Sequence, residues 1–202
     1  MLKIAVLVSG GGTNLQAILD AEVRGEIPSG KVSLVVASKP GVYALERAEN
    51  HNVPTVVVSR KDYDSAAEFD AALLKTLKDN EIDIVVLAGF LSILGEVVIA
   101  AYPNRIINVH PSLIPSFCGE GYYGLRVHEA ALSRGVKVTG TTVHFVNEEC
   151  DGGPIILQKA VDILPDDTPE TLQRRVMEQA EWLLLPQAVE MVAHALVQAG
   201  NN

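Results

Sequence analysis

The sequence predicts a single α/β domain: a Rossmann-like open sheet, mostly parallel with strand order 3-2-1-4-5, that ends in antiparallel strands. Two observations lead to this fold class. Through the first 110 residues, short continuous apolar runs alternate with amphipathic segments, as expected for parallel strands covered by helices on both faces. After residue 110 this alternation ends, and two strand-like segments joined by a turn-rich connection follow. We therefore expect residues 1–202 to form one domain, with a mononucleotide-binding half at 1–110 and a loop, a hairpin and a final helix at 111–202.

Hydrophobic periodicity places the elements of the first half. A short apolar run is typical of a buried strand, whereas apolar residues four positions apart, such as Phe69, Leu73 and Leu77, indicate one face of a helix. By these criteria, strands are expected at 4–8, 32–37, 55–58, 82–88 and 105–109, and helices at 13–24, 42–50, 65–78 and 93–101. Because helices connect the strands, right-handed crossovers would make this part of the sheet parallel.

The elements expected after residue 110 are a Pro- and Gly-rich loop at 112–124, a helix at 125–133 and two paired strands at 137–146 and 155–162. The connection between these strands is rich in turn-forming residues and would place Asp151 near the tip of a hairpin. The last helix is expected to begin at Thr168, a good N-cap, with Pro169 in its first turn, and to run toward Gln198. A bend is expected at Pro186, where proline removes one backbone hydrogen bond.

Composition narrows the classes of function. Of the 202 residues, 48% are apolar and 20% are charged, and a domain of this length buries about 70% of its unfolded surface. The formal net charge of −9 argues against nucleic acid as a partner. A small anionic ligand is still compatible with this charge, because backbone N–H groups bind phosphate without a basic surface.

Cysteine usage and the chain start indicate the compartment. Cys118 and Cys150 are the only cysteines, and they show neither metal-ligand spacing nor a disulfide framework. Residues 1–8 run directly into a glycine-rich loop and so indicate a first strand instead of a secretory signal. No apolar run approaches the length of a membrane span. We therefore expect a cytoplasmic protein that uses no metal and contacts no membrane.

Two polar residues stand at the end of the fifth expected strand. Asn108 and His110 alternate with Val109 and therefore point to the same side of the strand. Pro111 ends the strand, because it has no N–H to donate. Taken alone, such a pair is more often a core histidine and a turn-capping asparagine than a functional site. Other segments of the chain decide between these interpretations.

A glycine-rich loop from Ser9 to Leu15 joins the first strand to the first helix. Glycines let a phosphate approach the backbone, and the helix start supplies free N–H groups and the positive end of the helix dipole. The loop matches neither the dinucleotide fingerprint, which needs Gly or Ala in place of Leu15, nor a P-loop, which needs Gly-Lys-Ser/Thr. A tight strand–helix turn without a ligand explains the loop equally well.

The predicted strand order brings these segments to one edge of the sheet. In an open α/β sheet, ligands bind beyond the carboxyl ends of the strands, where the strand order reverses. With the order 3-2-1-4-5, the glycine loop, the apolar segment 88–94 and the pair Asn108 and His110 would line one cleft. Asp151 would reach this cleft from the hairpin tip. This convergence favours a functional site over separate packing roles.

These motifs resemble those of the folate-dependent formyltransferases. The segment from Asn108 to Pro115, followed further along the chain by Asp151 to Pro154, is highly specific for that superfamily. The opening from Ser9 to Ile18, the segment from Leu87 to Phe90 and the total length resemble the branch that formylates phosphoribosylglycinamide in purine synthesis. The resemblance extends from Met1 to about Pro186.

The resemblance implies transfer of a formyl group from the co-substrate 10-formyltetrahydrofolate to the amine of phosphoribosylglycinamide, with Asn108, His110 and Asp151 as the catalytic trio. Attack of the amine creates a tetrahedral oxyanion, which N–H groups of Asn108 and protonated His110 would stabilise. Asp151 beside the imidazole would raise the pKa of His110 toward the working pH and keep the ring charged. It would also help to move the amine's proton to the departing folate nitrogen. Neither a covalent enzyme intermediate nor a metal is required.

The same resemblance assigns residues to the two substrates. The phosphate would be held by Gly12, Thr13 and Asn14, and the ribose or glycinamide end would be contacted by Glu181. The folate site would comprise Asn108, Asp151, Leu91, Ser92, Ile93, Leu94, Asn147, Glu148, Glu149 and Cys150. Some relatives have arginine in place of Ser92, and another arginine, used toward the acidic tail of the folate, falls near Ala66. Arg60 and Lys61 are the candidate substitutes.

Three further features invite a functional interpretation. Cys150 lies beside Asp151, but a lone cysteine without a positioned base is more often an ordinary residue. We expect His144 to pack within its strand, with a supporting role beside the trio as the alternative, and His128 to lie on a helix surface. The segment 182–185 is expected to pack the last helix on the sheet, although an apolar helix can also form a dimer.

Other functions remain as alternatives. A non-catalytic sugar-phosphate-binding module explains the glycine loop but not the convergence of the trio. A formyltetrahydrofolate hydrolase would use water as acceptor, but relatives of that kind usually carry an N-terminal regulatory domain, whereas this chain begins with its first strand. Formyl transfer to an initiator aminoacyl-tRNA usually goes with a longer chain and a C-terminal domain. We favour the glycinamide acceptor and expect a monomer or a homodimer.

Overall fold

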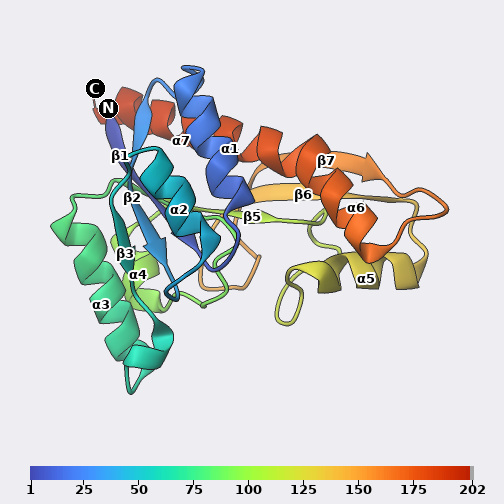
Figure 1. The fold of residues 1–202 in the computed structure, drawn as a ribbon, viewed down its shortest axis with the longest axis horizontal. Coiled ribbons are helices and arrows are strands. Elements are labelled where there is room, and N and C mark those ends of the chain that lie inside the picture. The colour runs from blue at the N-terminus through green and yellow to red at the C-terminus, as the bar shows by residue number, and fades with distance from the viewer. Residues whose placement is uncertain (201–202) are drawn as a thin grey trace.

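The computed structural model describes residues 1–200 and contains a seven-stranded sheet in the order β3-β2-β1-β4-β5-β6-β7 (Figure 1). The strands are β1 (Leu2–Val8), β2 (Gly30–Ala37), β3 (Thr55–Val57), β4 (Ile84–Leu87), β5 (Ile106–His110), β6 (Val138–Phe145) and β7 (Ile155–Asp162). The first five are parallel, whereas β6 is antiparallel to β5 and β7 to β6. The predicted fold class and the order 3-2-1-4-5 are confirmed.

Helices occupy most of the connections between the strands. They are α1 (Thr13–Val23), α2 (Tyr43–Asn50), α3 (Ala66–Asp79), α4 (Glu96–Ala101), α5 (Leu125–Arg134), α6 (Pro169–Val176) and α7 (Trp182–Gly200), with a 3₁₀ turn at Arg60–Asp62 and a π-helical turn at Met177–Glu181. The helix expected at 93–101 begins only at Glu96. Gly95 before it is extended and donates its N–H to Asp70 Oδ1 (3.1 Å), so the helix cannot continue backward through this residue.

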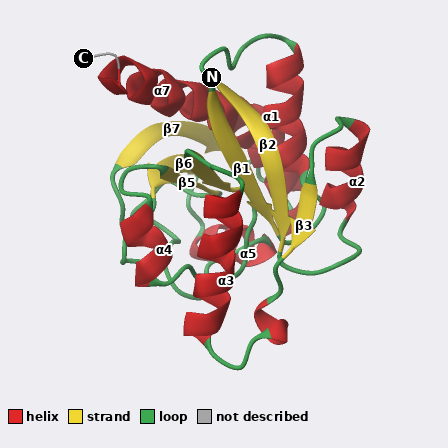
Figure 2. Ribbon diagram, turned by 90° about the vertical axis from the view of Figure 1, so that its left-hand side faces the viewer, coloured by secondary structure: helices red, strands yellow, loops and turns green. Residues whose placement is uncertain are grey.

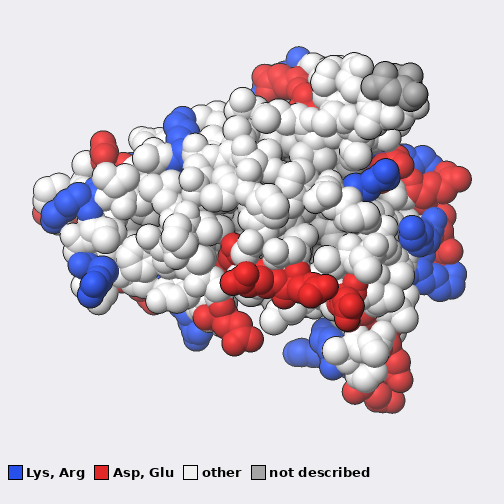
Figure 3. Space-filling model, turned by 180° about the vertical axis from the view of Figure 1, so that it is seen from behind, with Lys and Arg blue, Asp and Glu red and all other residues white. Residues whose placement is uncertain are grey.

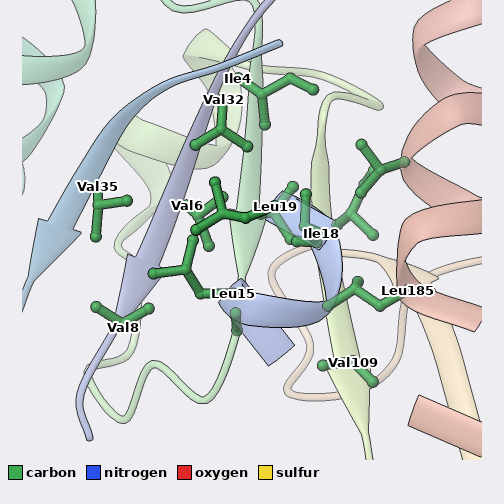
Figure 4. Packing of buried hydrophobic residues seen from close by; sticks show 14 of the residues in the cluster. Ile4, Val6, Val8, Leu15, Ile18, Leu19, Val32, Val35, Val109 and Leu185 are labelled. Atoms are coloured by element: carbon green, nitrogen blue, oxygen red, sulfur yellow. The ribbon is translucent and has the colours of Figure 1, made fainter. Parts of the chain in front are cut away.

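The inner strand β1 has apolar side chains on both faces, because successive residues of a strand point in opposite directions. Ile4, Val6 and Val8 pack with α1, α2 and α7, while Ala5 and Leu7 pack with α3 and α4. All five side chains are fully buried. Figure 2 shows α3 and α4 on one side of the sheet and α1 and α2 on the other. Figure 4 shows from close by the buried cluster that contains Ile4, Val6 and Val8. Because helices cover both faces of the sheet, a ligand site is expected at the ends of the strands.

The carboxyl ends of β1, β4 and β5 meet at one edge of the sheet. Leu7 is in register with Leu87, and Leu87 is in register with Asn108. β6 then returns in the antiparallel direction, so that His144 lies opposite Asn108. The loops that follow the three parallel strands therefore begin side by side, next to one end of β6.

The final helix starts as predicted but departs from α-helical geometry earlier than expected. Thr168 is the N-cap and forms a capping box with Thr171. The irregular turn is the π-helical segment Met177–Glu181, whereas Pro186 lies inside α7. The π-helical turn is thus an additional feature that was not expected, and the bend at Pro186 stays a prediction.

The surface carries the negative charge that the composition implies. Figure 3 shows a band of acidic side chains across one face of the molecule, with basic side chains mostly toward its two ends. None of the helices within residues 1–200 combines the length and the hydropathy needed to cross a membrane. In the same part of the chain, no three His, Cys, Asp or Glu side chains are grouped so that they could hold a metal ion.

Candidate active site

Three side chains from distant parts of the chain meet at the carboxyl end of β5. Asn108 and His110 belong to β5, and Asp151 lies in the connection between β6 and β7. Asp151 Oδ2 is 3.5 Å from His110 Nδ1, and Asn108 Nδ2 donates to Asp151 Oδ1 at 3.4 Å. The structure therefore brings together the three residues to which the resemblance assigns catalysis.

Asp151 is ionised at neutral pH. Gly119 N–H donates to its Oδ2 at 2.8 Å, and His144 Nε2 lies 3.5 Å from its Oδ1. Burial raises the pKa of this carboxyl, but the contacts with His144, His110 and the Gly119 N–H together outweigh burial and hold the pKa below its usual value. The carboxylate is thus a fixed negative charge beside both histidines.

His110 is mainly neutral in the free protein at pH 7. Its Nε2 is 2.9 Å from the Phe117 carbonyl, and its Nδ1 faces Asp151. Burial lowers the pKa of His110 more than Asp151 and the Phe117 carbonyl raise it, because the ring is only 4% exposed. Asp151 acts in the expected direction, but the expected net increase in the pKa is wrong. A proton that arrives at this ring is nevertheless stabilised by Asp151.

His144 contacts two members of the trio, Asn108 and Asp151. Its Nδ1 lies 2.8 Å from the Phe145 carbonyl, which only accepts hydrogen bonds, so Nδ1 carries a proton. Its Nε2 lies 3.1 Å from Asn108 Nδ2 and 3.5 Å from Asp151 Oδ1. Of the two interpretations of His144, the supporting position beside the trio is the one found. The position of His144 beside Asn108 follows from the pairing register of β5 with β6, and the local sequence does not determine that register.

The carbonyls of Gly10, Gly11 and Gly12 are all bonded to groups of α1 or α2. Each accepts one hydrogen bond: Gly10 from Ala44 N–H (3.2 Å), Gly11 from Arg47 Nε (2.8 Å) and Gly12 from Gln16 N–H (2.9 Å). Because a peptide unit is planar and trans, the N–H across each of these bonds points the opposite way. The N–H groups of residues 11 and 12 therefore point away from α2, and that of residue 13 points out of the start of α1, an arrangement that suits a phosphate.

Close packing holds this loop against α2 and against the segment after β4. Gly12 has φ 72°, and a Cβ at this position would lie 2.6 Å from Ala44 Cβ, so only glycine fits. Ser9 Oγ accepts hydrogen bonds from Ser38 Oγ (2.8 Å) and from Leu91 N–H (2.9 Å). Ser9, which the sequence analysis did not single out, thus joins the loops that follow three strands.

Asn14 and Glu181 connect the glycine loop to the last helix. Asn14 Nδ2 donates to Glu181 Oε2 at 2.7 Å, and both residues are buried. Burial raises the pKa of Glu181, and the bond from Asn14 opposes this increase in part. Thr13 Oγ1 lies 3.9 Å from Met177 Sδ. The residues assigned to phosphoribosylglycinamide therefore lie together, and Glu181 comes from a π-helical turn, a feature frequent at functional sites.

The residues assigned to the folate belong to two segments. In the first, Leu91 and Ile93 expose 62% and 75% of their surface, Ser92 is half-buried, and Leu94 packs in the core beside α3 and α4. The side chain of Leu94 is therefore not available to a ligand. The second segment, 147–150, is exposed throughout and leads directly into Asp151.

His128 does not lie on a helix surface as expected. It is fully buried in α5, on the same face as Val127 and Ala131. Its spacing of three residues from Ala131 is the signal that the sequence analysis overlooked. Neither ring nitrogen has a hydrogen-bond partner in the described chain. Burial and the nearby His110 lower the pKa of His128 to about 4.

Two surface hollows of about 560 and 400 Å³ lie away from the trio. The first is lined by residues that include Trp182 and Met191 of α7, and the second by residues that include Glu22 and His51. Neither contains a residue of the trio or of the glycine loop. Convergent polar groups, and not the volume of a hollow, locate the candidate site.

Known proteins resemble this chain over nearly its whole length. A family model described as formyl transferase matches residues 2–189. A phosphoribosylglycinamide formyltransferase of Haemophilus influenzae is 40% identical over 202 residues, which cover 100% of this chain and 92% of that protein. The trifunctional purine biosynthetic protein adenosine-3 of Homo sapiens is 44% identical over 200 residues, which are 99% of this chain but only 19% of that protein.

The solved structures agree with these sequence matches. Glycinamide ribonucleotide transformylase 1 from Symbiobacterium toebii has a TM-score of 0.90 at 44% identity, with 96% of this chain and 89% of that chain covered. Phosphoribosylglycinamide formyltransferase from Bacillus halodurans has a TM-score of 0.87 at 38% identity, with 94% of each chain covered. The chain therefore belongs to the formyl transferase family.

Proposed function

We propose that this protein transfers the formyl group of 10-formyltetrahydrofolate to the amine of phosphoribosylglycinamide, a reaction of purine synthesis, directly through a tetrahedral intermediate. The single observation that carries the proposal is the contact of Asn108, His110 and Asp151 at the strand edge that also bears the glycine loop. The names of the relatives support the choice of acceptor. We expect the enzyme to act in the cytoplasm as a monomer or a homodimer.

The trio supplies what attack of an amine on a formyl carbon requires. Attack converts the carbonyl into a tetrahedral oxyanion, and the Asn108 amide stabilises that charge when its N–H exchanges the long 3.4 Å bond to Asp151 Oδ1 for one to the oxyanion. The attacking amine must lose a proton, which neutral His110 accepts. Ionised Asp151 stabilises the imidazolium, which then returns the proton to the nitrogen of the departing tetrahydrofolate. No bond to the protein forms in this sequence.

The two substrates are proposed to lie on either side of the trio. The N–H groups of residues 11–13 would hold the phosphate of phosphoribosylglycinamide, with Glu181 toward its ribose or glycinamide end. The formyl donor would lie between the exposed side chains of Leu91 and Ile93 and the segment 147–151. Apolar side chains suit the faces of a flat ring, and the polar groups beyond them would fix its orientation.

A formyl-transfer assay with two acceptor conditions tests the proposal. Tetrahydrofolate should be released rapidly when phosphoribosylglycinamide is present and far more slowly when water is the only acceptor. Equal release in both conditions would replace the proposal with a hydrolase. Binding of the sugar phosphate without any turnover would instead favour a sugar-phosphate-binding module.

A variant of His110 tests the role of the trio within this reaction. His110→Ala should retain the fold by circular dichroism but lower kcat by about 10²–10³-fold, the range found when a key stabilising group is lost. The matched control is His194→Ala, which changes an exposed histidine of α7 and should leave kcat unchanged. Near-normal turnover of His110→Ala would contradict the proposed role.

A further inference from the structure

Arg47 of α2 is a cationic side chain that is fixed against the glycine loop. Its Nε donates to the Gly11 carbonyl at 2.8 Å, and its Nη1 donates to Gln16 Oε1 at 2.9 Å. Its guanidinium carbon lies 4.9 Å from the centre of the Tyr43 ring. These neutral partners hold the half-buried side chain along the first turn of α1.

The charge of Arg47 is not neutralised by the described part of the protein. Arg24 pairs with Glu26, and Arg175 pairs with Asp167, but Arg47 forms no ion pair with any carboxylate of residues 1–200. The backbone N–H groups of residues 10–12, close to it, also donate to no acceptor there. A fixed guanidinium beside free N–H groups is a combination that an anion with several oxygen acceptors can satisfy.

We propose that Arg47 determines specificity for an acceptor that carries a phosphate. Its bond to the Gly11 carbonyl turns the N–H of Gly12 away from α2 and toward the ligand, because the two groups lie on opposite sides of one trans peptide. Its charge then attracts a phosphate monoester, which carries close to two negative charges at pH 7. This inference rests on the proposed function, since it takes the sugar phosphate of the acceptor to lie at the glycine loop.

Kinetics with two acceptors test this role. For Arg47→Met, the KM for phosphoribosylglycinamide should rise by about 10- to 100-fold, the scale of one charge–charge contact near a protein surface. Arg47→Lys, which keeps the charge but not the planar donor geometry, should show a smaller increase. The kcat and the KM for 10-formyltetrahydrofolate should stay within about threefold. With ribosylglycinamide, the acceptor without phosphate, kcat/KM should be the same for Arg47→Met and for the unchanged protein.

The controls distinguish a role of Arg47 in selecting the phosphate from a role in supporting the loop, and from an effect of the net charge of the protein. Arg24→Met makes the same change in net charge at the other end of α1 and should leave the KM for phosphoribosylglycinamide unchanged. If Arg47→Met lowers kcat/KM equally for both acceptors, Arg47 only supports the loop and the proposal is overturned. If neither acceptor is affected, the proposal is overturned as well.

Binding of inorganic phosphate keeps this inference distinct from the proposed function. If the protein fails to formylate phosphoribosylglycinamide, titration with inorganic phosphate, followed through the NMR amide signals of Gly11 and Gly12, still tests Arg47. Phosphate should shift these signals, and Arg47→Met should raise the Kd by about tenfold, equivalent to the loss of one modest charge contact. Absence of binding, or an unchanged Kd in the variant, would overturn the role of Arg47.

Discussion

At the scale of single residues, the protonation of His110 follows from two opposing influences. Burial removes the water that would solvate an imidazolium, whereas Asp151, 3.5 Å away, stabilises it. Because burial is the larger influence, the ring is mainly neutral before reaction and ready to take a proton from the amine. The formyl-transfer rate should therefore fall as the pH drops through the pKa of His110.

Asp151→Asn should lower the pKa of His110 further, because the variant removes the carboxylate that opposes the effect of burial. The acid limb of the rate profile should move to lower pH, and kcat should fall by about 10²–10³-fold, since the imidazolium formed in the reaction loses its stabilising charge. NMR titration of the imidazole C–H signals measures the pKa. Asp166→Asn, an exposed carboxylate, is the control. An unchanged His110 titration in Asp151→Asn would exclude the pairing.

Some residues of the candidate site could be predicted from the sequence, whereas others could not. Alternation along a strand places Asn108 and His110 on one side, and turn-forming residues place Asp151 at a hairpin tip. His144 and Arg47 were not assigned to the site, because their contacts depend on strand register and on the approach of α2 to the glycine loop. Both are contacts between segments far apart in the chain, and short-range patterns do not contain them.

At the scale of elements, the β6–β7 connection holds Asp151 through a close backbone contact. Gly153 is buried, and a Cβ on it would lie 1.8 Å from the Phe145 carbonyl oxygen. The Phe145 N–H donates to the Pro154 carbonyl at 2.9 Å beside this contact. The position of the carboxylate therefore depends on a residue without a side chain two positions later.

Gly153→Ala should displace this connection and with it Asp151. We expect a loss of about 1–3 kcal/mol in the free energy of unfolding, the usual range for overpacking, together with a lower kcat. Urea denaturation and the formyl-transfer assay measure the two effects. Gly152→Ala is the matched control, because the atoms nearest to its Cβ belong to the exposed side chain of Glu149 and not to a buried backbone carbonyl, so its losses should be smaller. Equal losses in the two variants would show that the contact with Phe145 is unimportant.

The final helix shows where element prediction reaches its limit. Thr168 and Pro169 mark the helix start through local chemistry, and the structure confirms this start. The π-helical turn at Met177–Glu181 was not predicted, because its extra residue serves the placement of Glu181 against Asn14, a contact with α1. Long-range packing therefore determines the shape of this turn.

At the scale of the whole molecule, the alternation of apolar strands and amphipathic helices predicted the parallel sheet, and the order common in such open sheets supplied 3-2-1-4-5. Burial in the smaller C-terminal part was harder to predict, because α5 mixes polar and apolar residues on its buried face. His128 lies on that face and is fully buried. Its pKa is lowered from the ordinary 6.5 to about 4. The fold therefore contains a histidine that must stay neutral.

This neutral histidine should make global stability depend on pH. Between pH 6.5 and about 4 the unfolded chain binds a proton at His128 that the folded protein does not, so its contribution is fully present above pH 6.5 and is lost as the pH falls toward 4. The loss should reach about 3 kcal/mol in the free energy of unfolding.

Urea denaturation at pH 7.5 and 4.5 should show a smaller difference for His128→Leu than for the unchanged protein. His194→Leu, at an exposed position, should preserve the full difference. Some dependence should remain in His128→Leu, because burial also lowers the pKa of His110. If His128→Leu and the unchanged protein lost the same stability, the buried ring would have to accept its proton without opening the fold.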